Sequence, residues 1–149
     1  MWLKILKVQR ILLPSVFLTV GITSVSYAQT VPESFVTPSG NIRCTVVGEN
    51  NDTLRCDIRS GLNPKPPQPY ANYCEYDWGG GFLLSEYGKP EILCVSDTFD
   101  ANYKLSYGST WQKSGFNCVS QKTGLTCINA SGDGFFLSRE SWKILSSDR

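Results

Sequence analysis

Apolar and polar residues alternate in two neighbouring segments, 41–47 and 53–58, and this period of two is typical of half-buried β-strands. Turn-forming residues at 48–52 separate them. Folded as a hairpin, the segments bring three pairs opposite one another in one register: Ile42 with Ile58, Cys44 with Cys56, and Val46 with Leu54. A slip of one residue would turn one apolar set to the wrong face, so the pattern predicts a hairpin clamped by a disulfide bond.

A second hairpin follows the same design nearer the C-terminus. Two β-like segments flank a turn that contains Gly124, and this arrangement brings Cys118 opposite Cys127. Both hairpins have Ser-Gly before the first cysteine and Leu-x-Cys at the second. These similarities fit two origins equally well: an internal duplication of one hairpin unit, or two hairpins that arose independently.

The first residues of the chain have the three-part layout of a secretory signal peptide. Three basic residues precede an uncharged apolar run over 11–25, and the small-x-small pattern of 26–28 follows. The run is shorter than the roughly 20 residues that a membrane-spanning helix needs, which argues against the alternative of an uncleaved anchor. We therefore expect residues 1–28 to be removed and residues 29–149 to form one exported β-rich domain, in the periplasm or outside the cell.

All six cysteines follow this leader, and an even number in an exported chain predicts three disulfide bonds. Zinc is the alternative, but the gaps of 12, 18, 20, 24 and 9 residues contain no short ligand pair, so no metal site is expected. With the two hairpins closed, Cys74 and Cys94 remain for each other across a turn at 87–90. The bonds are expected to reinforce an apolar core rather than to replace one.

The remaining segments are short and show no long helical period. Strands are expected at four further places: 82–84, 91–95, 104–107 and 134–139. Residues 140–145 fit either a strand or a helical turn. The glycines at 79–81 predict an interruption of regular structure, and the prolines of 63–69 predict an extended connector on the surface. The pattern predicts an all-β protein, a small disulfide-stapled sandwich or open barrel built from antiparallel hairpins.

The composition removes whole classes of chemistry. The chain has no histidine, so no Ser-His-Asp or Cys-His nucleophile and no imidazole metal site can form. It also lacks the G-x-S-x-G, S-x-x-K and phosphate-loop patterns. Without the leader, the 14 basic residues fall to 11 against 13 acidic ones, which argues against nucleic acid or an anionic membrane as an electrostatic partner. No cofactor is expected.

The main candidates for a functional site lie in one short stretch after Cys74. Glu75 and Asp77 are two apart, so on a strand their side chains would leave one face about 7 Å apart, a separation compatible with the carboxylates of a glycosidase. Tyr76 and Trp78 would leave the opposite face, where they could bind a sugar ring or a protein, or could cover the disulfide as core. The binding candidates are therefore Tyr76, Asp77 and Trp78.

Other polar and aromatic residues receive structural interpretations. Oxygen-rich segments 50–52 and 97–100 lack the ligand count of a calcium site, so turn chemistry accounts for them. Arg139, after an apolar strand, is interpreted as a charge that blocks further strand pairing. Four aromatic residues are expected on the surface: Tyr70, Tyr73, Tyr87 and Trp111.

Several short strings run along the exported part of the chain: Phe35-x-Thr37-Pro38-Ser39-Gly40-Asn41-Ile42-x-Cys44, Leu54-x-Cys56, Asp77-Trp78-Gly79, Leu105-x-Tyr107-Gly108, Gly124-Leu125-Thr126-Cys127-x-Asn129 and Gly134-Phe135-x-Leu137-Ser138-Arg139. Together they resemble a family of small exported bacterial proteins of unknown function. The resemblance implies export, disulfide bonds and bacterial origin, and it argues against glycosylation at Asn51 and Asn129. It implies no activity.

These observations favour a non-catalytic binding or inhibitor module of the bacterial cell envelope, with a protein or a glycan as its unidentified partner. One alternative is a histidine-free carbohydrate-active enzyme that uses Glu75 and Asp77, and another is a structural envelope protein. A deep cleft around the two acids would favour the enzyme. A flat, exposed aromatic patch would favour the binding module.

Overall fold

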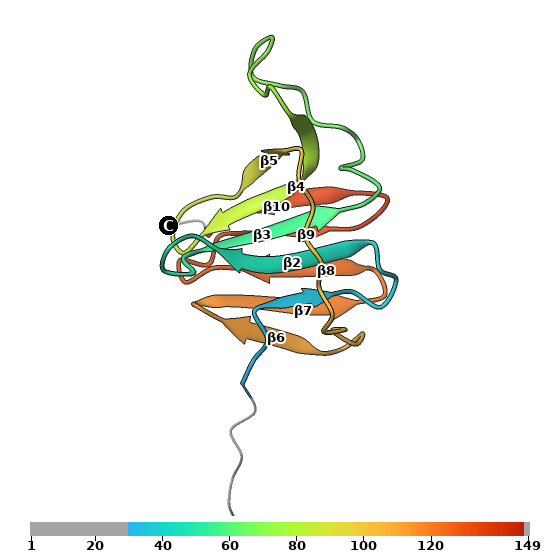
Figure 1. The fold of residues 1–149 in the computed structure, drawn as a ribbon, viewed down its shortest axis with the longest axis vertical. Coiled ribbons are helices and arrows are strands. Elements are labelled where there is room, and N and C mark those ends of the chain that lie inside the picture. Colours follow the sequence, from blue (N-terminus) through green and yellow to red (C-terminus); the bar gives the residue numbers. More distant parts are fainter. Residues whose placement is uncertain (1–29, 148–149) are drawn as a thin grey trace, which may run out of the picture.

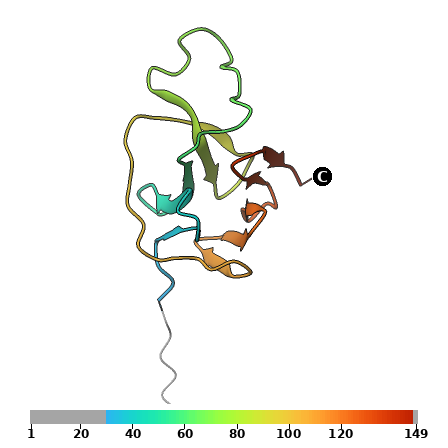
Figure 2. The ribbon, with the colours of Figure 1, turned by 90° about the vertical axis from the view of Figure 1, so that its right-hand side faces the viewer.

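The computed structural model describes residues 30–147 and shows a sandwich of two antiparallel β-sheets, each with five strands (Figures 1 and 2). The described residues contain no helix, and the sheets are not closed into a barrel. The predicted all-β, disulfide-stapled sandwich is confirmed. The predicted signal peptide, residues 1–28, lies outside the described residues.

Each sheet is a simple meander in which consecutive strands are neighbours. The first sheet consists of β1 (Ser34–Val36), β2 (Ile42–Val47), β3 (Thr53–Ile58), β4 (Asp77–Ser85) and β5 (Glu91–Val95). The second consists of β6 (Thr110–Lys113), β7 (Phe116–Gln121), β8 (Gly124–Ile128), β9 (Gly134–Leu137) and β10 (Trp142–Leu145). Short turns suffice for most of these connections, because antiparallel neighbours need no crossover.

The predicted register and the predicted cysteine pairing are both confirmed. Ile42 lies opposite Ile58, Val46 lies opposite Leu54, and Cys118 lies opposite Cys127. The disulfide bonds join Cys44 to Cys56, Cys74 to Cys94, and Cys118 to Cys127, at sequence separations of 12, 20 and 9 residues. Closing loops of this size contributes roughly 3 kcal/mol each in the chain-entropy model, against a typical net stability of about 5–15 kcal/mol.

One row of side chains crosses each sheet, and the two rows have the same design. In the first sheet, Cα partners on successive strands are Phe35, Cys44, Cys56, Phe82 and Ile92. In the second sheet they are Trp111, Cys118, Cys127, Phe135 and Ile144. Each row therefore has the same order: an aromatic residue, two cysteines, a phenylalanine and an isoleucine. The similarity between the two cysteine hairpins, seen in the sequence as Ser-Gly and Leu-x-Cys, thus extends to all five strands of each sheet.

The first four members of each row are buried in the core between the sheets, where the rows meet, whereas Ile144 is 43% exposed. Phe82 stacks on Phe135 with ring centroids 4.9 Å apart and planes 19° from parallel, and Phe35 contacts Trp111 at 5.0 Å. The sulfur atoms of Cys44, Cys56 and Cys127 lie within 4.8 Å of one another, so the disulfides of the two sheets are adjacent. All these sulfurs are in disulfide bonds, so none is a thiolate ligand for a metal.

Several local predictions are wrong. The glycines at 79–81 do not end a strand; β4 runs through them, with an irregular register between Trp78 and Phe82. Trp111 is only 2% exposed, because it occupies the first position of the row in the second sheet. Residues 104–107 form one parallel bridge, from Lys104 to Val36, rather than a strand.

The C-terminal end also differs from one prediction. Arg139 does not end the sheet, because the chain turns at residues 138–141 and β10 pairs with β9. The hydroxyl of Ser138 closes this turn: it donates to the Ser141 carbonyl at 2.9 Å and accepts from the Ser141 amide at 3.0 Å. Of the two possibilities for residues 140–145, the strand is therefore the observed one.

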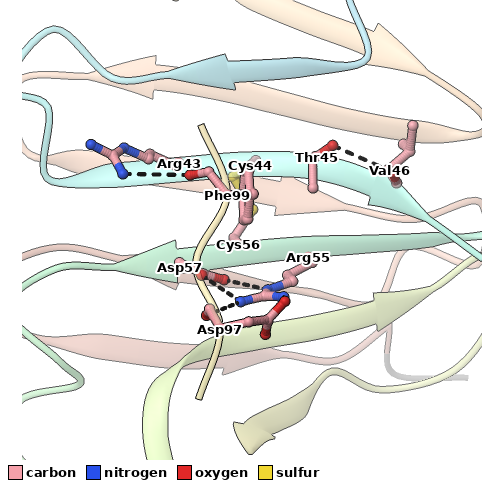
Figure 3. Close-up of polar contacts among 9 residues, drawn as sticks. All are labelled: Arg43, Cys44, Thr45, Val46, Arg55, Cys56, Asp57, Asp97 and Phe99. Atoms are coloured by element: carbon pink, nitrogen blue, oxygen red, sulfur yellow. Dashed lines mark hydrogen bonds and ion pairs between the residues drawn. A yellow bond between two sulfur atoms is a disulfide. The ribbon is translucent and has the colours of Figure 1, made fainter. Parts of the chain in front are cut away.

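The segment that links the two sheets, residues 96–109, crosses the outer face of the first sheet. Hydrogen bonds from Arg43 and Arg55 hold it there (Figure 3). Arg55 binds the carboxylate of Asp57 through two hydrogen bonds of 2.8 Å, and its guanidinium also donates to the side chain and the carbonyl of Asp97. The Phe99 ring lies 5.2 Å from the same guanidinium. The hydrogen bonds to Asp57, followed by those to Asp97, raise the pKa of Arg55 against the opposing effect of its burial.

Asn129 joins the two sheets at one end of the sandwich, beyond the last residue of β8. Its buried amide donates to the carbonyl of Ser85, the last residue of β4, and to that of Gly88, in the turn that follows. Its carbonyl oxygen accepts from Ser131 and from the Asp133 amide. Both ends of the Asn129 amide are therefore occupied within the fold.

Gly134 provides a test of the close packing beside the second row. A Cβ at this position would overlap the carbonyl oxygen of Cys127 and would lie 2.8 Å from the Cα of Ile128. We expect Gly134→Ala to lower the free energy of unfolding by about 2 kcal/mol or more, measured by urea denaturation. Gly80→Ala is the matched control: its nearest atom would be 4.0 Å away, and we expect a change within about 0.5 kcal/mol. Equal effects would contradict the packing argument.

Asp133 provides a test by pH. A hydrogen bond from the Ser147 amide, together with one from the Ser131 hydroxyl, lowers the pKa of this carboxyl below its usual 3.8. A lowered pKa in the folded state adds stability above pH 3.8 that is lost as the pH falls through the folded-state value. We expect wild type to have a higher Tm than Asp133→Asn at about pH 5 and this difference to shrink towards pH 2. A difference independent of pH would contradict this role.

Candidate functional site

The main difference between the two five-stranded halves is the connection between their third and fourth strands. In the second half, residues 129–133 suffice, whereas the first half uses residues 59–76. This long connection, the aromatic loop, projects beyond both sheets at the top of Figures 1 and 2. Three of its tyrosines are exposed: Tyr70 at 64%, Tyr73 at 47% and Tyr76 at 62%.

Tryptophans and prolines fix the base of the aromatic loop. The indole N–H of Trp78 donates to the Pro66 carbonyl at 2.9 Å, and that of Trp142 donates to the Pro64 carbonyl at 2.8 Å. The amide of Leu62 adds a hydrogen bond of 2.8 Å to the carbonyl at position 79. Proline has no N–H and cannot join a strand ladder, so these side-chain donors replace the pairing that the segment lacks.

The tip of the loop is held by a disulfide bond of its own and by ring contacts. Cys74 is bonded to Cys94, in β5. The Tyr73 ring meets Trp78 edge-on at 5.4 Å and Tyr70 edge-on at 5.1 Å. A loop held in this way loses little conformational freedom when its exposed rings bind a partner.

The structure separates the three residues predicted for binding. Tyr76 and Asp77 are exposed, whereas Trp78 is only 9% exposed and uses its N–H for the Pro66 carbonyl. Of the two possibilities for these aromatic residues, covering the disulfide therefore fits Trp78, which lies opposite Cys94, and does not fit Tyr76. Trp78 supports the loop, and Tyr76 belongs to its exposed surface.

The two acids of the enzyme alternative do not form the expected pair. β4 begins at Asp77, so Glu75 precedes the strand and does not share its alternation. Both residues are exposed, and neither lines the concavities formed by the turns at one end of the sandwich. The observation that would favour a carbohydrate-active enzyme, a deep cleft around the two acids, is not found at these residues.

The sequence did not predict a groove of about 530 Å³ at one end of the sandwich. Hydroxyl and amide side chains make up half of its lining residues, among them Ser39, Asn41, Gln121, Thr123 and Ser138. A smaller concavity of about 320 Å³ continues it, because the two share Ser39, Asn41 and Arg139. We call the two together the polar groove.

A signal for the polar groove was present in the sequence. Four of the strings that carry the family resemblance contribute lining residues, represented by Asn41, Tyr107, Gly124 and Arg139. In a meander, alternate turns lie at the same end of the sheet, so the strings that form the turns after β7 and β9 could have been placed together. What the strings could not give is the relative placement of the two sheets.

The structure thus defines a disulfide-stapled β-sandwich that carries one rigid aromatic loop and one polar groove. The chain belongs to the family of unknown function DUF6636, whose match covers residues 13–145. No curated protein and no solved structure matches the chain significantly. Within the described residues, no helix is long and apolar enough to cross a membrane. Three disulfide bonds are typical of an oxidising compartment.

The bond between Cys74 and Cys94 allows the rigidity of the loop to be tested separately from that of the core. We expect the double variant Cys74→Ser, Cys94→Ser to keep the sandwich folded, because the other two disulfide bonds join strands within it. Limited proteolysis should then cut between residues 66 and 76 at least tenfold faster than in wild type. Unchanged cleavage would contradict a loop fixed by this bond, and loss of the whole fold would show that the bond also supports the core.

Proposed function

We propose that this protein is a non-catalytic binding module, exported to the bacterial cell envelope, which presents its aromatic loop to a glycan. The observation that carries the proposal is the asymmetry of the two halves. A matched meander is interrupted once, and the interruption exposes three tyrosines on a loop with its own disulfide bond. Loops of this length within a compact domain are uncommon and are usually functional.

The chemistry of the loop favours a glycan over an apolar partner. The exposed rings of Tyr70 and Tyr76 offer flat faces for the C–H face of a sugar, and each carries a hydroxyl for the sugar's polar groups. Tyrosine also gives a large contact area with few rotatable bonds. Asp77 lies exposed beside Tyr76 and adds acceptor oxygens for sugar hydroxyls.

A binding role also accords with the chemistry that the sequence lacks. The chain has no histidine, and Glu75 and Asp77 lie outside the grooves. The three disulfide bonds and the secretory leader predicted over residues 1–28 support export. A structural envelope protein would need no exposed aromatic loop, so the loop is the feature that favours binding.

A glycan array probed with the protein tests this proposal. We expect Tyr70→Ala and Tyr76→Ala each to weaken binding of the selected glycan at least tenfold, since each removes an exposed stacking surface. Tyr87→Ala is the matched control, because Tyr87 is 66% exposed but lies in the turn between β4 and β5. All variants should keep the Tm of wild type. Equal losses in all three variants, or an array without any ligand, would overturn the proposal.

A further inference from the structure

The polar groove is a recessed surface, built without the exposed tyrosines of the projecting aromatic loop. It is formed by the turn between β1 and β2, the turn between β7 and β8, the turn between β9 and β10, and the first residues after β3. Both sheets contribute to it, so it lies across the open end of the sandwich. Its main part, about 530 Å³, is within the usual size range of sites for small ligands.

Internal hydrogen bonds fix the turns that form the groove. The Thr37 hydroxyl lies 3.3 Å from both the amide and the carbonyl of Ile42, and the Gly40 amide donates to the Thr37 carbonyl at 2.8 Å. The Asn41 side chain donates to the Ser60 hydroxyl at 3.3 Å, which links the turn to the residues after β3. The groove is therefore largely preformed, as small-molecule sites usually are.

Three cations of the polar groove have no acidic partner. Within residues 30–147, the side chains of Arg59, Lys122 and Arg139 take part in no hydrogen bond or ion pair, whereas Arg43 and Arg55 are paired with aspartates. Lys122 lines the larger part, Arg59 lines the smaller part, and Arg139 lines both. The cations are therefore distributed along the groove.

The charge of the groove is opposite to that of residues 29–149 as a whole. Its lining has three cations and one carboxylate, Glu140, whereas residues 29–149 carry 11 basic and 13 acidic residues. Unpaired cations in a recess attract anions and orient their carboxylates through paired hydrogen bonds. The groove is therefore suited to an anionic ligand.

The uncharged part of the lining suits a ligand that is larger than a small anion. Hydroxyl and amide groups of Ser39, Gln121 and Thr123 offer both donors and acceptors, which suit sugar hydroxyls. The half-exposed ring of Tyr107 and the edge of Phe136 supply apolar surface for the C–H face of a sugar. A simple inorganic anion would use neither feature.

We propose that the polar groove binds an acidic saccharide, a short chain of sugar rings that carry carboxylates. The carboxylates bind Arg139 and Arg59, while a ring rests against Tyr107 and its hydroxyls meet the amide and hydroxyl groups of the lining. The site is separate from the tyrosines of the aromatic loop and does not depend on the function proposed for them.

Titration calorimetry with trigalacturonate as the probe tests this proposal. We expect saturable binding that is lost when the carboxylates are converted to methyl esters, because the esters keep the rings and remove the charges. Arg139→Gln and Arg59→Gln should each raise the Kd about tenfold, as expected for loss of a charged hydrogen bond. Lys143→Gln is the matched control, an exposed cation of β10 outside the groove, and should leave the Kd unchanged.

Three further measurements distinguish a saccharide site in the groove from a simple anion site and from binding by the aromatic loop. Equal binding of the methyl ester would overturn the role of the cations. Full competition by inorganic phosphate at the same concentration would show a simple anion site and would overturn the saccharide. Tyr70→Ala should not change the Kd; a loss as large as that of Arg139→Gln would place the ligand on the aromatic loop instead. Unchanged Tm values keep each variant informative.

Discussion

The contact between the two cross-sheet rows is the interaction on which the rest of the structure depends. Each sheet is held at its centre by a disulfide bond between adjacent strands, and the sulfurs of the two sheets come within 4.8 Å of one another. The stacked rings of Phe82 and Phe135 complete this contact. Because the rows have the same order in both sheets, the aromatic rings and sulfurs of one row meet those of the other, and these contacts hold the two sheets together.

A core of this kind explains why the chain can carry an elaborate loop. A sandwich of short strands has limited apolar area, and the disulfide bonds add stability that does not depend on area. The connection after β3 can therefore lose regular pairing, since tryptophan N–H groups and one further disulfide bond are enough to hold it. The equivalent connection after β8 is short and is used for structure: Asn129 and Asp133 tie it to its neighbours.

Much of the fold could be predicted, because a period of two combined with paired cysteines leaves one register. Cys44 opposite Cys56 and Cys118 opposite Cys127 follow from that reasoning. It failed where tertiary contacts decide. Trp111 lies in a segment without alternation, yet it is buried by Phe35 of the other sheet. Tyr76 follows the alternation of its neighbours, yet it lies before β4 begins and is exposed.

The candidate sites show the same division. A linear sequence reveals that aromatic residues are concentrated near position 75, but not which of them support the loop and which face solvent. It also cannot distinguish a cation that holds the fold from one that remains available. The guanidinium of Arg55 is fully engaged by Asp57, Asp97 and the Phe99 ring. Its contacts with Asp97 and Phe99 hold the 96–109 segment against the first sheet (Figure 3).

Arg139 belongs to the same residue type but has no such partner among the described residues, because it sits in a turn at the end of the sandwich. Position in the meander therefore decides the role. Arginines on the outer face of a sheet meet the segment that crosses it, and arginines in the turns face the space between the sheet ends. The second group is the one whose hydrogen-bonding capacity is left for a ligand.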